Sequence, residues 1–75
     1  MNAELFKALE SKYKAQRTIA KTNLKLYLSD PVAVADHPDM VETIDKLFKE
    51  YAEAVEHINI LKELDYELVG NERIL

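Results

Sequence analysis

Apolar residues, with one glutamine among them, recur every three or four positions along two long stretches of the chain. In the first stretch, residues 3 to 29, the recurring positions are Leu5, Leu9, Tyr13, Gln16, Ala20, Leu24 and Tyr27. In the second stretch, residues 38 to 69, a broader row comprises Met40, Val41, Ile44, Leu47, Phe48, Tyr51, Ala54, Val55, Ile58, Leu61, Leu64 and Leu68. This spacing is that of one face of an α-helix. The pattern therefore predicts two amphipathic helices.

The two stretches are separated by the segment that holds both prolines of the chain, Pro31 and Pro38. Because proline cannot continue a helix, we expect a loop over residues 30 to 37, with Pro38 in the first turn of the second helix. Gly70 is typical of a residue that ends a helix, which leaves residues 70 to 75 as a tail. The sequence predicts one all-α domain, residues 1 to 75, folded as an antiparallel two-helix hairpin.

The position of the loop also predicts how the helices pair. If the turn is centred on residues 33 to 35, the numbers of two residues that face each other across the hairpin add up to about 68. Leu9 then lies by Ile58, and small Ala20 faces large Phe48 in the middle of the hairpin, as interdigitating layers require.

Composition limits the functions that remain. The chain has 75 residues, one glycine and no cysteine, with 48% apolar and 32% charged residues. Without cysteine there is no disulfide, thiolate zinc site or cysteine nucleophile. The apolar stretches are too interrupted by charge to span a membrane, and the N-terminus lacks the pattern of a signal peptide, so we expect a soluble cytoplasmic protein.

Few groups for catalysis or metal binding are present. Glu53 and His57 are four residues apart on the second helix, whereas di-iron bundles use a Glu and a His three apart on two helices. His37 is interpreted as a loop or cap residue. No nucleophile, base and orienting acid can be assembled from two histidines and three threonines. We therefore expect no enzyme activity, no metal and no cofactor.

The apolar row of the second helix is wider than one partner helix can cover. The residues expected to remain uncovered by the hairpin are Leu47 and Tyr51 on one flank and Val41, Phe48 and Val55 on the other. A chain this small also rarely forms a sufficient core alone. We expect self-association, most simply a dimer forming a four-helix bundle, or docking on another protein.

Charge is unevenly distributed between the two halves. Residues 1 to 29 carry six Lys/Arg and two Glu, and residues 30 to 75 carry four Lys/Arg and twelve Asp/Glu. A basic stripe lies beside the apolar face of the first helix and consists of Lys7, Lys14, Arg17, Lys21 and Lys25. It suits either a solvated or helix-pairing surface or, as the alternative function, a nucleic-acid-binding surface. The second helix has an acidic outer face formed by Glu42, Asp45, Glu53, Glu56, Glu63 and Glu67.

The segment Asp30-Pro31-Val32-Ala33-Val34-Ala35-Asp36-His37-Pro38-Asp39 resembles an Asn-Pro-Val-Gly-Ile-Gly-Glu-His-Pro-Asp segment of small helical proteins of tailed bacteriophages. Alanine stands at positions 33 and 35 where those proteins have glycine. The resemblance implies a viral origin and a helix on each side of the segment. Those proteins have no established activity to transfer. On the basis of this resemblance, we expect the protein to be a small phage accessory factor that binds a host or virion protein.

Overall fold

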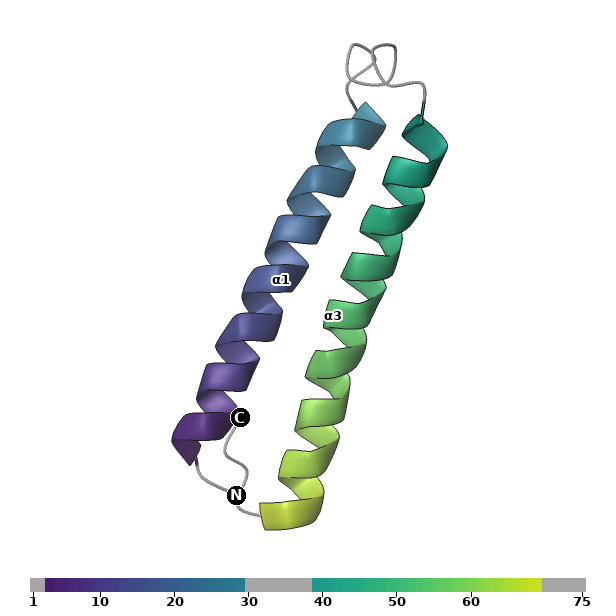
Figure 1. Ribbon diagram of the computed structural model, residues 1–75. Coiled ribbons are helices and arrows are strands. Elements are labelled where there is room, and N and C mark those ends of the chain that lie inside the picture. The colour runs from purple at the N-terminus through teal and green to yellow at the C-terminus, as the bar shows by residue number, and fades with distance from the viewer. Residues whose placement is uncertain (1–2, 30–38, 70–75) are drawn as a thin grey trace.

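The computed structural model describes residues 3–29 and 39–69, which form two long helices lying side by side and antiparallel (Figure 1). Helix α1 spans Ala3–Ser29 and helix α3 spans Met40–Val69. No strand occurs within these ranges. The predicted all-α hairpin is confirmed. The predicted loop, the start of the second helix at Pro38 and the tail at 70 to 75 lie outside the described residues.

The helix ends are marked by local interactions. Each helix has a carboxylate in its first turn, Glu4 in α1 and Glu42 in α3, where the helix dipole favours negative charge. The amide of Thr43 donates to the carbonyl of Asp39 at 3.0 Å, so Asp39 accepts the first helical hydrogen bond of α3. At the other end of α1, the hydroxyl of Ser29 donates to the carbonyl of Lys25. Serine and threonine side chains commonly make this bond to the carbonyl four residues earlier in a helix.

The core is a single narrow seam between the two helices. On α1 the buried residues are Phe6, Ala20 and Leu24, and on α3 they are Met40, Ala54, Ile58, Leu61 and Asp65. Phe6 is 0% exposed and lies near the beginning of α1. We call the end of the hairpin where α1 begins and α3 ends the open end (Figure 1). The molecule measures 51 × 15 × 15 Å, the dimensions of a rod two helices wide.

The pairing of the helices differs from the prediction by about two residues. The ring of Tyr13 packs on that of His57, with centroids 4.8 Å apart, so paired residues sum to about 70. In keeping with this register, Ala20 lines the same hollow as Glu50 and Ala54. The predicted contact between Ala20 and Phe48 is wrong, because Phe48 is 52% exposed.

The physical reason for this difference is the small size of the central seam residues. Ala20 and Ala54 are 3% and 2% exposed, so small side chains occupy the seam at this level. A phenylalanine ring in the place of either alanine would overpack the seam. Several residues of the wide apolar row of α3 could have occupied the seam. Ala54 occupies it, and Phe48 lies to one side.

Candidate interaction surfaces

The hairpin has two long faces, one on each side of the seam. On the first, which we call the lysine face, Arg17, Lys21 and Lys25 of α1 border a groove with Tyr51 and Val55 of α3. On the second, the leucine face, Leu9 of α1 borders a groove with Ile60 and Leu64 of α3. All further side chains are assigned to one of these faces by their position around the helix, at about 100° per residue.

The lysine face collects the predicted basic stripe. Lys7, Lys14, Lys21 and Lys25 are exposed and Arg17 is partly buried. The groove beside them has a volume of about 530 Å³ and is also bordered by Thr18 and Thr22. The ring of Tyr51 is supplied by the other helix, so an aromatic residue borders the basic stripe even though α1 has none interleaved with its lysines.

The predicted protein interface is divided by degree of exposure. Val41 is 83% exposed and Phe48 52% exposed, whereas Leu47, Tyr51 and Val55 are partly buried. The prediction that Tyr51 lies on the flank opposite Val55 is wrong, because both side chains line the groove of the lysine face. Of the five predicted interface residues, Val41 and Phe48 are therefore the most accessible.

The leucine face is the larger apolar surface, and half of its exposed apolar residues were missed by sequence reasoning. Its exposed apolar residues are Leu5, Ile19 and Leu26 on α1 and Ile60, Leu64 and Leu68 on α3. Ile19, Leu26 and Ile60 were not part of either predicted row. The spacing of Leu5, Ile19 and Leu26, fourteen and then seven residues apart, was the available signal for a second stripe on α1.

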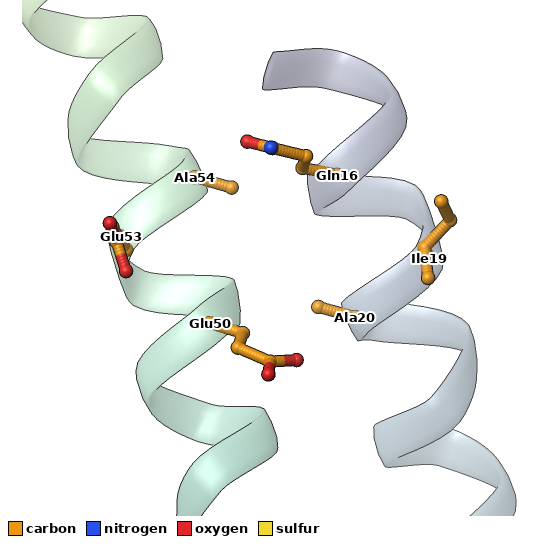
Figure 2. A pocket seen from close by; sticks show the side chains of 6 residues that line it. All are labelled: Gln16, Ile19, Ala20, Glu50, Glu53 and Ala54. Carbon is orange, nitrogen blue, oxygen red and sulfur yellow. The ribbon is translucent and has the colours of Figure 1, made fainter. Parts of the chain in front are cut away.

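A hollow of about 340 Å³ opens between the helices where Ala20 and Ala54 approach (Figure 2). Gln16 and Ile19 of α1 and Glu50 and Glu53 of α3 complete its lining. In Figure 2 the side chain of Glu50 extends from α3 toward α1. The hollow exists because alanine side chains fill little space, and its polar groups do not form a nucleophile and base pair.

His57 is the one histidine in the described residues, and its ring packs between the two helices. Its Nε2 lies 3.9 Å from Oε1 of Glu53, and its Nδ1 is buried without a hydrogen-bond partner. Its ring packs on Tyr13 with the planes inclined by 56°. No group of three or more His, Asp or Glu side chains within residues 3–29 and 39–69 is arranged to hold a metal ion.

Asp65 is a buried carboxyl residue that sequence reasoning did not single out. It is 1% exposed and lies in the seam near the open end, at about the same level as Phe6. Its position seven residues after Ile58 and four after Leu61 was the signal, because both of those residues are also in the seam. Leu64, which was predicted there, is 37% exposed on the leucine face.

The charged outer surface carries ion pairs within single helices. Lys14 Nζ lies 3.6 Å from Glu10 Oε1 in α1, and Lys49 Nζ lies 3.1 Å from Asp45 Oδ2 in α3. Both pairs are solvated, and such pairs contribute about 0.2 to 1 kcal/mol.

Neither described helix has the length and apolar character needed to cross a membrane. Comparison with known protein families, with curated proteins and with solved structures gave no match.

Proposed function

We propose that this chain is a non-enzymatic helical interaction protein that acts by packing its exposed apolar side chains against helices of another polypeptide. One observation carries the proposal. Among the described residues, ten large apolar side chains are more than a third exposed, whereas seven apolar side chains are buried. A rod two helices wide leaves much of its apolar surface in water, and helix association is the usual way to cover such a surface.

A second copy of the chain is the simplest polypeptide to cover this surface, since two hairpins form a four-helix bundle. The resemblance of residues 30 to 39 to a segment of phage proteins supports a further role for the bundle. It would then act as a small phage accessory factor in the host cytoplasm, with a host or virion protein as its ligand.

Sedimentation velocity of the purified chain over roughly 10 to 500 µM tests the association. We expect the sedimentation coefficient to rise from that of one hairpin to that of two, and the melting temperature to rise with it, because mass action stabilises an associated state. A chain that remains monomeric over this range contradicts self-association.

The leucine face can be tested separately as the surface for a host or virion protein. The immobilised chain and its variants Ile19→Lys and Leu68→Lys are each incubated with host lysate. Ile19 and Leu68 are 61% and 56% exposed, so a lysine is tolerated at either position. A bound protein that persists after nuclease treatment and is lost with both variants supports the proposal. Equal capture by all three chains contradicts it.

A nucleic-acid-binding function is the second candidate, favoured by the placement of Tyr51 beside Arg17, Lys21 and Lys25. Basic side chains would neutralise phosphates while the aromatic ring stacks on a base. Anisotropy of a fluorescent 20-nucleotide RNA tests this function between roughly 50 and 300 mM salt. Affinity that falls steeply with salt and is lost in Lys21→Gln supports it, because phosphate binding releases counterions.

A further inference from the structure

Three kinds of side chain form parallel rows along the lysine face. The first row is basic, lies on α1 and comprises three lysines of the basic stripe, Lys7, Lys14 and Lys25. The second row is apolar, lies on α3 and consists of Val41, Phe48 and Val55. The third row is acidic, lies about 60° further around α3 on the side away from α1, and consists of Asp45, Glu56 and Glu63. The apolar row therefore separates two rows of opposite charge.

We propose that a second copy of this chain covers the lysine face, in a dimer whose two-fold axis runs along the helices, so that the two α3 helices pair parallel and in register. This inference rests on the proposed function and specifies the face and the orientation of the association. The apolar rows of the two copies meet at the axis, and each basic row meets the acidic row of the other copy.

The spacing of the charges identifies the second copy as the occupant. The lysines at 25, 14 and 7 are separated by eleven and seven residues, and so are the acidic residues at 45, 56 and 63. Because Tyr13 lies level with His57, the numbers of two residues at the same level of the hairpin add up to about 70. Lys25 is then level with Asp45, Lys14 with Glu56, and Lys7 with Glu63.

The direction of pairing follows from the same rows. A two-fold rotation about an axis along the helices keeps each residue at its own level and exchanges the two edges of the face. Every lysine of the basic row then meets an acidic residue of the other copy. A two-fold axis across the helices keeps the edges and places one basic row on the other, which like-charge repulsion disfavours.

The apolar row suits a parallel pair of helices. Val41, Phe48 and Val55 are each seven residues apart, the spacing that keeps one stripe facing a partner helix. The β-branched valines are residues that favour two-stranded parallel pairs at such positions. The row ends at Lys62, so the apolar contact covers the part of α3 nearer Met40 and the charged pairs continue toward the open end.

Cysteine cross-linking tests the orientation, and the chain has no cysteine of its own. In a parallel dimer Val41→Cys and Val55→Cys each form a disulfide with themselves under mild oxidation, because identical positions meet at the axis. A mixture of the two variants then gives few mixed dimers. An antiparallel dimer gives the reverse result, mixed dimers without self-linked ones, and overturns the proposal. Ile19→Cys on the leucine face is the control and should not cross-link.

A charge exchange tests the pairing of the rows. Lys7→Glu should weaken the dimer roughly 5- to 30-fold, because two exposed pairs are replaced by repulsions. The double variant Lys7→Glu with Glu63→Lys should restore the dissociation constant to within about threefold. Lys12→Glu, which makes the same charge change away from the lysine face, is the matched control and should leave the constant unchanged. A double variant as weak as Lys7→Glu alone overturns the proposal.

The outcomes separate this inference from the function on which it rests. A dimer that forms normally but fails the cross-linking or the charge exchange overturns the orientation and leaves self-association standing. A chain that stays monomeric, with circular dichroism showing intact helices, overturns both. A dimer that dissociates after nuclease treatment overturns the proposal in favour of a nucleic acid that bridges two lysine faces.

Discussion

The ring of Tyr13 packs on the ring of His57 across the seam, with centroids 4.8 Å apart and planes inclined by 56°. Tilted aromatic pairs at this separation are favourable beyond the apolar area they bury. The contact joins residues near the middles of the two helices. It therefore fixes the level at which each residue of α1 meets α3.

Replacing His57 should show that its ring, and not its nitrogen atoms, contributes to stability. His57→Phe keeps a ring against Tyr13 and removes the buried Nδ1, which has no hydrogen-bond partner. We expect it to be as stable as the original chain or up to about 1 kcal/mol more stable. His57→Ala should lose about 1 to 2 kcal/mol with the ring contact. Urea unfolding measures both, and a His57→Phe variant as unstable as His57→Ala would contradict the interpretation.

Phe6 should be the aromatic residue on which the fold depends most. It is 0% exposed, and truncation of a buried phenylalanine costs about 3 to 5 kcal/mol, comparable to the whole stability expected of a chain this small. Phe6→Ala should therefore be largely unfolded by circular dichroism. Phe48→Ala, which truncates a 52% exposed ring, should keep its helices and lose only the ability to associate. Equal helix loss in the two variants would show that Phe48 is buried in the single hairpin.

Asp65 should also be sensitive, for a different reason. Its carboxyl group is 1% exposed, and the residue takes part in an interaction that its removal would break. Because the loss of a buried polar interaction is destabilising, Asp65→Ala should cost about 1 to 3 kcal/mol in urea unfolding. Asp45→Ala is the matched control, since Asp45 is a solvated aspartate on the same helix. Its effect should stay within about 0.5 kcal/mol.

Filling the hollow between Ala20 and Ala54 should stabilise the single hairpin. Glu50 extends from α3 toward α1 at this level, so a leucine there would cover the two alanines with apolar surface (Figure 2). Glu50→Leu should raise the stability by about 0.5 to 1 kcal/mol. Glu53 borders the same hollow from further around α3, so Glu53→Leu should give a smaller gain in stability. A loss of stability in Glu50→Leu would show that the hollow is needed for the native pairing.

The sequence was sufficient to predict the helices because their signals are local. Apolar spacing marked both amphipathic stretches, and α1 spans the predicted residues 3 to 29. The side-by-side packing of the helices also followed from the single short loop predicted between them. These properties depend on neighbours within a few positions, which the sequence displays directly.

The register and the uncovered surface were harder to predict because they depend on contacts between the helices. A row that contains Phe48, Ala54 and Ile58 offers several possible seams, and its largest residue was chosen as the central one. The structure instead places Ala54 there, and Phe48 is 52% exposed to one side of the seam. Three members of the basic stripe, Arg17, Lys21 and Lys25, do border one groove, because residues of a single helix keep fixed positions relative to one another.

A rod only two helices wide has no layer that is shielded on all sides. Each turn of α1 packs mainly on the neighbouring turn of α3, so the stability of this hairpin resembles a sum of nearest-neighbour terms. Its backbone amides should therefore exchange with deuterium in a gradient, slowest around Tyr13 and His57 and fastest toward Ala3 and Ser29. Opening by successive turns would expose the apolar seam locally, while the remainder of the rod stays paired.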